Sequence, residues 1–327
     1  MRNVLQLTSA EVRALITPRL AVEALWRLYT QRIPEESAPP RSIARGDGVW
    51  CRALIAALPD GSYMGGKVFG RGRRGGVSYV VLLFDQESGQ LVAILDGDAI
   101  TALRTSATSA VAVKATLGGQ RVRMGLLGSG KEAYHHVLAI REVVDLSGVS
   151  VYSPTREHRE TLAKRLNEEH GLVCVAVEDP REAVAGCELV VAACRPRQEV
   201  PALELGWLDE RTKMVVSVGS TLPEQRELDE RVLGAARVIV LDSRREVLHE
   251  TGDFLAATKA GWDLADRVVT LDQWVRRTEQ GWSDGLVVYK SAGHGVQDVA
   301  LAAAVYSRAV SGGKDAGRRV VAESGMR

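Results

Sequence analysis

The sequence lacks the cysteine spacing and the long apolar runs that mark several large classes of protein. Its four cysteines stand far apart with no C-x-x-C pair, which argues against a zinc site or a disulfide framework and fits a reducing compartment. No stretch approaches about 18 uninterrupted apolar residues, and the N-terminal segment lacks the apolar core of a signal peptide. These absences predict a cytoplasmic protein without a membrane partner.

The chain also lacks an excess of charge of either sign. Lysine and arginine number 42, aspartate and glutamate number 41, and the formal net charge is +1. Such a balance gives no global attraction to nucleic acid, so we expect no nucleic-acid partner. Two histidines, His135 and His136, are adjacent, and neighbouring helical positions point about 100° apart, so they cannot form a chelate and we expect no metal site.

What is present is enough chain for two domains, since 327 residues correspond to roughly two units of about 150. The first third of the chain contains both predicted helices and predicted strands. A helix is expected over Ala21–Arg32 with Pro18 in its first turn, and strands are expected at Val49–Leu58, Tyr63–Phe69, Ser78–Phe84 and Leu91–Leu95. A long helix, Asp98–Leu117, follows. Between the second and third strands runs Gly70–Gly76, a basic loop that fits either a solvated hairpin tip or a guard of an acidic substrate's pocket.

From Arg121 onward, short apolar strands alternate with helices. Strands are expected at Val122–Leu127, Val149–Tyr152 and Val238–Leu241, among others, and a helix at Arg156–His170. Continuous apolar strands that alternate with helices are typical of a parallel sheet covered on both faces. The sequence therefore predicts an α/β fold with a doubly wound domain over residues 118–289.

The first strand of this region runs into a glycine-rich turn, G-x-G-x-x-A, that opens a helix. Gly128 would allow the tight turn, Gly130 would let the backbone approach a pyrophosphate, and Ala133 would allow close packing of helix on strand. The free N–H groups of the helix N-terminus would bind the anion. This pattern predicts a dinucleotide site that includes Gly128, Ser129, Gly130, Lys131 and Glu132.

The end of the second strand bears on which dinucleotide is bound. NAD-binding proteins usually carry an acidic residue there, but this strand is followed by Ser153, Pro154, Thr155 and Arg156. Ser153 and Thr155 can donate hydroxyl hydrogen bonds to a 2′-phosphate, and Arg156 can pair with it. We therefore expect NADP(H) to be favoured, with NAD(H) possible.

Several longer segments together resemble the ornithine cyclodeaminase/mu-crystallin family, over roughly Pro40 to Tyr306. They are MGGKV (Met64–Val68), LLFDQESGQLVAILDGDAITALRTSATSA (Leu82–Ala110), GLLGSGKEA (Gly125–Ala133), SVGSTLPEQRELD (Ser217–Asp229), ETGDF (Glu250–Phe254) and YKSAGHGVQDVA (Tyr289–Ala300). The resemblance implies a homodimer in which a Rossmann domain (118–289) is inserted in an α+β substrate-binding and dimerisation domain (1–117 and 290–327). It also implies an NAD(P)-dependent oxidoreductase that acts on the C–N bond of a small α-imino or α-amino acid.

The resemblance assigns roles to single residues. Arg41, Lys67 and Arg104 would bind the substrate carboxylate, with Lys67 and Arg104 as the catalytic pair, a task that suits buried cations of fixed geometry. Further residues would border the cofactor: Cys194, Val218, Gly219, Lys290, Ser291 and Gly293.

Thr221 marks a departure from the cyclodeaminase branch of the family. That branch resembles this chain but carries an aspartate at the position where Thr221 stands, so by the resemblance Thr221 would be a substrate-binding residue. A hydroxyl group cannot serve as a base near neutral pH, which favours imine reduction or amino acid oxidation over cyclisation. Three alternatives stay open: a cyclodeaminase-type ammonia lyase, an N-carboxyalkyl amino acid dehydrogenase, and a cofactor-binding protein without turnover.

Overall fold

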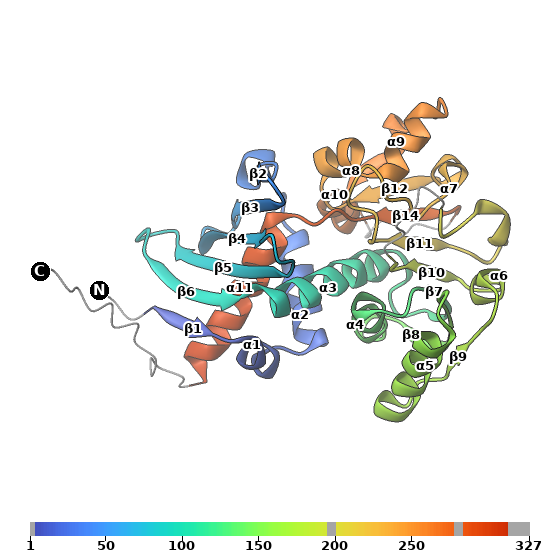
Figure 1. Cartoon of the computed structure of the whole chain (residues 1–327), viewed down its shortest axis with the longest axis horizontal. Helices are drawn as coiled ribbons and strands as arrows, with labels where there is room; N and C mark the ends of the chain where they lie inside the picture. Colours follow the sequence, from blue (N-terminus) through green and yellow to red (C-terminus); the bar gives the residue numbers. More distant parts are fainter. Residues whose placement is uncertain (1–3, 195–200, 278–283, 313–327) are drawn as a thin grey trace, which may run out of the picture. The chain divides into compact units, whose positions relative to one another are not determined.

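The computed structural model describes residues 4–194, 201–277 and 284–312, and it divides the chain into two units (Figure 1). Unit 1 consists of Met1–Leu28, Ile33–Arg104 and His294–Arg327, and unit 2 of Tyr29–Arg32 and Thr105–Gly293. Both ends of the chain thus contribute to unit 1. Within the described residues, no helix is both long and apolar enough to cross a bilayer.

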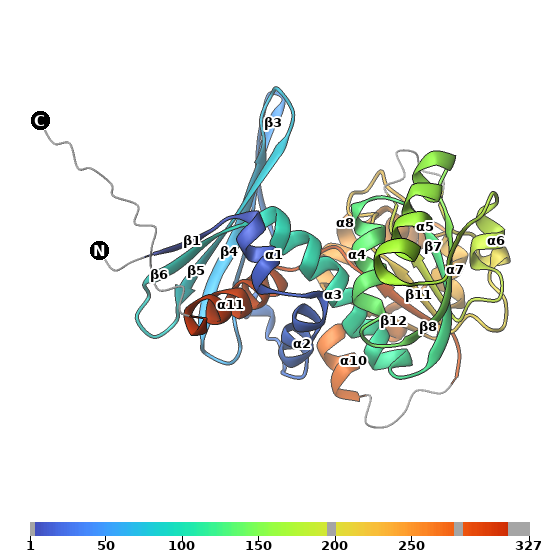
Figure 2. The same ribbon diagram turned by 90° about the horizontal axis from the view of Figure 1, so that it is seen from below.

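Unit 1 is built on a six-stranded sheet in the order β1-β6-β5-β4-β3-β2, in which only β1 and β6 pair in parallel. Its elements are β1 (Leu5–Leu7), α1 (Ser9–Leu15), α2 (Pro18–Tyr29), β2 (Ser42–Gly46), β3 (Val49–Ala57), β4 (Tyr63–Arg71), β5 (Val77–Asp85), β6 (Leu91–Asp96), the start of α3 (Gly97–Leu117) and α11 (Gly295–Ser311). Helix α11 packs on β3, β4 and β5, so a helix from the end of the chain covers strands from its beginning (Figure 2).

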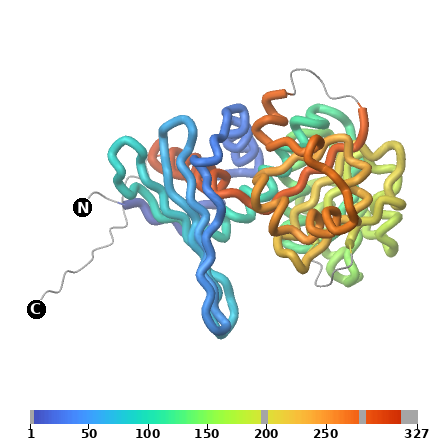
Figure 3. The backbone as a smooth tube through the Cα atoms, turned by 90° about the horizontal axis from the view of Figure 1, so that it is seen from above, coloured from blue at the N-terminus to red at the C-terminus, as the bar shows by residue number. Residues whose placement is uncertain are grey.

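The predicted basic loop Gly70–Gly76 joins β4 to β5 at the tip of a long hairpin. Beside it lies the shorter connection between β2 and β3, and the two tips extend together away from the rest of the sheet (Figure 3). Arg71, Arg73 and Arg74 are exposed there, and Arg73 pairs with Asp47 across the two tips.

Unit 2 contains an eight-stranded sheet, parallel throughout, in the order β13-β12-β14-β11-β10-β7-β8-β9. Its elements are β7 (Arg121–Leu127), α4 (Lys131–Ile140), β8 (Asp145–Tyr152), α5 (Arg156–His170), β9 (Cys174–Ala176), α6 (Pro180–Val184), β10 (Leu189–Ala192), β11 (Met214–Ser217), α7 (Glu230–Ala235), β12 (Val238–Leu241), α8 (Arg244–Glu250), α9 (Gly252–Lys259), β13 (Val268–Thr270), α10 (Leu271–Arg277) and β14 (Val287–Lys290). The strands β10, β11, β12 and β14 are buried along their whole length, as expected for a sheet covered on both faces. The predicted α/β class and doubly wound sheet are confirmed.

Helix α3 belongs to both units, because the division falls between Arg104 and Thr105 inside it. The sequence prediction placed the boundary at residue 117, where the helix ends. The second half of α3 contacts unit 2 through two side-chain pairs, Ser109 with His136 and Thr116 with Trp274. These contacts explain why the residues between 105 and 117 group with unit 2.

Candidate active site

In unit 1, two buried cations share one buried carboxylate. Lys67 lies on β4 with 2% of its surface exposed, Arg104 lies on α3 with 7% exposed, and Asp298 lies on α11 and is fully buried. The Lys67 Nζ atom donates to Asp298 Oδ1 at 3.0 Å, and Arg104 Nε donates to the same oxygen at 3.2 Å. These three side chains together carry a net charge of +1.

Neighbouring polar groups fix both cations. Asp96 accepts hydrogen bonds from the first amides of α3, so the start of the helix is capped. One turn later, Thr101 donates its hydroxyl to Gly97 O at 2.7 Å and accepts from Lys67 Nζ at 3.2 Å. On α11, Gln297 Oε1 accepts from Arg104 at 3.0 Å. The ammonium and the guanidinium are therefore held in fixed positions by α3 and α11.

The other oxygen of Asp298, Oδ2, is buried and has no hydrogen-bond partner among the described residues. A buried charged acceptor without a donor is costly, and this oxygen has the capacity to accept a further hydrogen bond. Arg41, the third cation predicted from the sequence, lies partly buried in the segment before β2. The site thus offers two cationic donors and one anionic acceptor.

In unit 2, the turn after β7 has the geometry that the glycine pattern predicts. Gly128 has a φ of +123°, its amide donates to Tyr152 O at 2.8 Å, and a Cβ there would lie 2.5 Å from Ala193 O. A side chain at this position would strain the backbone and collide with the chain after β10. Gly130 is the N-cap of α4, no side chain caps that end, and the space where its Cβ would be is open. The helix N-terminus can therefore hold a pyrophosphate.

The residues predicted to bind the 2′-phosphate of the dinucleotide lie at the end of β8. Ser129 donates its hydroxyl to Ser153 at 2.7 Å, which ties the glycine turn to this strand end, and Thr155 follows as the N-cap of α5. Arg156 is 70% exposed and pairs with Glu160 at 2.7 Å and, at 3.7 Å, with Glu178.

Sequence reasoning missed a second arginine at this end of the sheet. Arg159 is buried, donates to Ser153 O at 2.8 Å and pairs with Glu178 at 3.4 Å. Its position one turn after Arg156 on α5 is the signal that could have identified it. Lys131 is exposed in the first turn of α4, and Glu132 beside it is half-buried.

The residues predicted to border the cofactor further along the sheet follow its carboxyl edge. Cys194 follows β10, Val218 and Gly219 follow β11, and Lys290 ends β14. Gly219 leaves no room for a side chain, because a Cβ would overlap the carbonyl of Cys194. Burial raises the pKa of the Cys194 thiol well above its usual value, and Glu227 adds to the rise, so this thiol is a packing group rather than a nucleophile.

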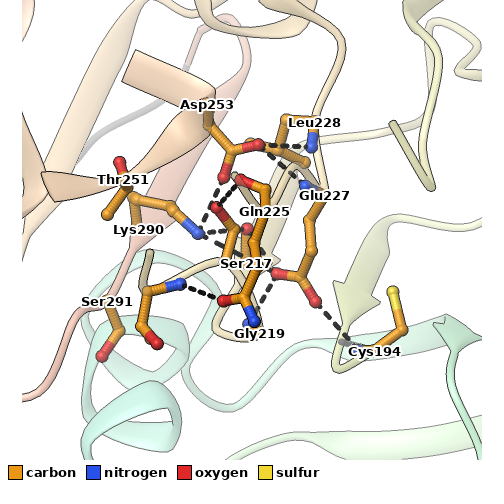
Figure 4. Close-up of polar contacts among 12 residues, drawn as sticks. Cys194, Ser217, Gly219, Gln225, Glu227, Leu228, Thr251, Asp253, Lys290 and Ser291 are labelled. Carbon is orange, nitrogen blue, oxygen red and sulfur yellow. Dashed lines mark hydrogen bonds and ion pairs between the residues drawn. The ribbon is translucent and has the colours of Figure 1, made fainter. Parts of the chain in front are cut away.

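Buried carboxylates behind these loops are the main feature that the sequence did not reveal. Asp242 accepts from the Ser291 hydroxyl at 2.6 Å and from the amides of Ala292 and Gly293 at 2.9 Å each. Glu227 binds the amides of Cys194 and Gly219 in the same manner, and Figure 4 shows it among its partners. Glu227 lies in one of the segments that carry the family resemblance, but nothing in the spacing indicates that its side chain is buried.

Two further residues considered in the sequence analysis, Thr221 and His136, form hydrogen bonds within unit 2. Thr221 lies in the loop after β11, where its amide donates to Gln225 Oε1 at 3.1 Å. His136 is buried and bonded to Ser109 and to the Glu132 carbonyl. The part of the chain that the structure describes holds no group of three side chains suited to a metal ion.

Comparison with known proteins identifies the family of the chain. The model of the ornithine cyclodeaminase/mu-crystallin family matches residues 70–313. The chain is 32% identical over 232 residues to ketimine reductase mu-crystallin of Rattus norvegicus, covering 71% of this chain and 70% of the relative. It is 27% identical over 275 residues to a Δ1-pyrroline-2-carboxylate reductase of Bacillus cereus, covering 83% and 81%.

A solved structure from the comparison has a fold similar to that of this chain. The Δ1-pyrroline-2-carboxylate reductase of Thermococcus litoralis, solved in complex with NADH and L-proline, matches with a TM-score of 0.85 at 25% identity, over 95% of this chain and 98% of that one. The predicted resemblance is confirmed. This chain belongs to the ornithine cyclodeaminase/mu-crystallin family.

Proposed function

We propose that this protein reduces the C=N bond of a small α-imino acid with a reduced nicotinamide dinucleotide, giving the α-amino acid. The protein is an NAD(P)-dependent oxidoreductase of C–N bonds, like its relatives named for ketimine and pyrroline-2-carboxylate reduction. One observation carries the proposal: Lys67, Arg104 and Asp298 form a buried site of net charge +1, in which one acceptor oxygen lacks a partner among the residues that the structure describes.

The substrate class follows from this charge pattern. An α-imino acid presents one carboxylate and, next to it, a nitrogen that carries a proton in the iminium form. Lys67 and Arg104 neutralise the carboxylate, with the guanidinium able to form two parallel hydrogen bonds, while Asp298 Oδ2 accepts from the iminium N–H. Each charge of the substrate then faces an opposite charge of the site, and the occupied site keeps its net charge of +1.

The reaction balances with one hydride and one proton. The bound dinucleotide supplies a hydride from C4 of its ring. The imino acid, the reduced dinucleotide and one proton yield the amino acid and the oxidised dinucleotide. Asp298 stabilises the iminium form by keeping the proton on nitrogen, and Lys67 and Arg104 keep the α-carbon in place through the carboxylate.

Unit 2 fits the dinucleotide. The open N-terminus of α4 at Gly130 and the tight turn at Gly128 suit the pyrophosphate, and Ser153 with Arg156 suits a 2′-phosphate. NADPH is the reductant that we propose. Arg156 and Arg159 already pair with acidic side chains, so a 2′-phosphate would have to compete with Glu160 and Glu178.

The test is an assay of purified protein with NADPH or NADH and Δ1-pyrroline-2-carboxylate, following the near-ultraviolet absorbance of the reduced nicotinamide. We expect stoichiometric oxidation of the dinucleotide with this substrate and very little with 1-pyrroline, the same ring without the carboxylate. Equal rates with both rings would remove the role of Lys67 and Arg104. Release of ammonia from a diamino acid without net oxidation would show a lyase instead.

We further propose that the protein is a homodimer, which the family resemblance implies, and that it resides in the cytoplasm. Light scattering during size-exclusion chromatography measures the assembly directly. A mass of one chain, at the concentrations used for assays, would contradict the dimer.

A further inference from the structure

Three ionisable side chains are buried together in unit 2, and the reaction as described above does not use them. Glu227, Asp253 and Lys290 are each 0% exposed. The Lys290 Nζ atom lies 2.9 Å from Asp253 Oδ2 and 3.9 Å from Glu227 Oε2 (Figure 4). With one positive and two negative groups, this buried cluster has a net charge of −1.

The contacts of Glu227 favour its ionised form. It accepts from the amides of Cys194 at 2.8 Å and Gly219 at 2.7 Å, and from the Ser217 hydroxyl at 2.7 Å, while Lys290 donates to Ser217 at 2.9 Å. All three direct partners of Glu227 are donors, which a carboxylate satisfies and a carboxylic acid does not. Asp253 fixes the backbone segment that carries Glu227, since its Oδ1 accepts from the amides of Glu227 and Leu228.

The cluster lies at the edge of the sheet where the glycine turn begins. Leu127, Ala192, Ser217 and Lys290 occupy one row of the register across four neighbouring strands, and Leu127 directly precedes Gly128. In doubly wound sheets the dinucleotide binds beyond the carboxyl ends of the strands, at the point where the strand order reverses. Here the order reverses between β7 and β10. In such a sheet the adenosine end would lie over β7 and β8, and the nicotinamide end would lie over β10, β11 and β14.

The two forms of the nicotinamide ring differ in charge. The oxidised ring is a cation and the reduced ring is neutral, so a nearby buried negative charge stabilises the oxidised form more than the reduced form. We propose that the Glu227–Asp253–Lys290 cluster favours the oxidised nicotinamide and thereby promotes departure of the hydride, with Glu227 as a positioning residue that also holds the loops at Cys194 and Gly219. This inference rests on the proposed function.

The test compares the affinities for NADP⁺ and NADPH, measured by fluorescence titration of the folded protein without substrate. In Glu227→Gln the preference for NADP⁺ relative to NADPH is expected to fall about fivefold to tenfold, the scale of one unit charge acting through protein beyond contact distance. Glu224→Gln, an exposed residue of the same loop, is the matched control and leaves the ratio unchanged. An unchanged ratio in Glu227→Gln overturns the proposal.

A second variant separates charge from structure. Lys290→Met makes the cluster more negative, so its NADP⁺ preference is expected to rise, opposite to the effect of Glu227→Gln. A purely structural role would weaken both nucleotides in both variants, and a parallel fall of the ratio in the two variants overturns the proposal. Failure of the wild-type protein to bind either nucleotide would instead refute the proposed function.

The wild-type protein gives a test that does not depend on the folding of variants. Burial raises the pKa of Glu227 above its ordinary value, against the lowering effects of Lys290 and Ser217, and Asp253 adds to the rise. Besides Lys290 and Asp253, the Cys194 thiol faces this carboxyl, and its own raised pKa keeps it neutral. As pH falls over the range in which the protein stays folded, uptake of a proton by Glu227 removes a negative charge from the cluster, so the NADP⁺ preference is expected to decline. A ratio that stays constant, or rises, overturns the proposal.

Discussion

The buried imidazole of His136 predicts a specific loss of stability in mild acid. His136 on α4 is fully buried, with Nδ1 donating to the Glu132 carbonyl at 2.7 Å and Nε2 at 3.0 Å from the Ser109 hydroxyl on α3. Burial lowers the pKa of His136 from its ordinary 6.5 to about 4. The folded protein therefore keeps this side chain neutral over a range in which the unfolded chain takes up a proton.

The size of the effect follows from that difference in pKa. Between pH 6.5 and about pH 4 the unfolded state binds one more proton, so the free energy of unfolding falls as pH falls, by about 1.4 kcal/mol per pH unit. Above pH 6.5 the imidazole is neutral in both the folded and the unfolded state, so the full free energy of unfolding is present. The loss is about 2 kcal/mol by about pH 5 and about 3 kcal/mol over the whole window.

The assay is denaturant unfolding of wild-type protein and His136→Leu at about pH 7.5 and about pH 5. His136→Leu removes the titrating group while filling the space, so the stability difference between the two proteins should shrink by about 2 kcal/mol in acid. His158→Gln, on the exposed side of α5, is the matched control and should show no such change. A wild-type-to-variant difference that is equal at both pH values would refute the reasoning.

Three further predictions concern the two sites. Gly128→Ala should weaken dinucleotide binding about tenfold to a hundredfold, because the φ of +123° disfavours a side chain and the new Cβ would lie 2.5 Å from the Ala193 carbonyl oxygen. Titration with NADPH measures the affinity, and an unchanged affinity would contradict the turn geometry. Lys67→Met should lower kcat/KM for Δ1-pyrroline-2-carboxylate about tenfold to a hundredfold with unchanged NADPH affinity, and activity retained in full would exclude a carboxylate contact. Arg156→Asp should reduce the preference for NADPH over NADH about tenfold, whereas Arg165→Asp, which also removes a helical arginine–glutamate pair, should not.

Helices and strands with strong local signals could be predicted closely. The helix Arg156–His170 and the strand Val238–Leu241 agree with the structure residue for residue, because each is bounded by clear signals and has one dominant pattern. The helix expected over Ala21–Arg32 begins at Pro18, the residue predicted to lie in its first turn, and ends three residues earlier than expected, at Tyr29. A proline can begin a helix, since its missing N–H is not needed in the first turn.

Elements that depend on distant partners were not predicted. The three-residue strand β1 exists because it pairs in parallel with β6, almost ninety residues later. The order of strands in the sheets is equally a property of long-range pairing. Local sequence carries little information on either, because the same short apolar segment can form a strand, a turn or the end of a helix.

The cations of the sites were easier to find than the anions that organise them. Lys67 and Arg104 stood out because a charged residue among apolar or small neighbours is unusual, and both prove to be buried. Glu227 lies between Arg226 and Leu228, and Asp253 between Gly252 and Phe254. Neither pattern of neighbours marks the carboxylate as buried. Their role depends on Lys290, which lies far along the chain and comes next to them only through strand pairing.

The two buried clusters have opposite residual charges, and each is the complement of the group that it is proposed to serve. The Lys67–Arg104–Asp298 cluster of unit 1 has a net charge of +1 and suits the carboxylate of the substrate, while the Glu227–Asp253–Lys290 cluster of unit 2 has a net charge of −1 and suits a cationic ring. If these are separate functions, Lys67→Met should change the KM for the imine and leave the NADP⁺-to-NADPH affinity ratio intact, and Glu227→Gln should do the reverse. The double variant should then show both the change in KM and the change in affinity ratio. Its total effect should equal the product of the two single effects, because the clusters share no side chain. An affinity ratio altered by Lys67→Met would show that one charge balance, rather than two, governs the reaction.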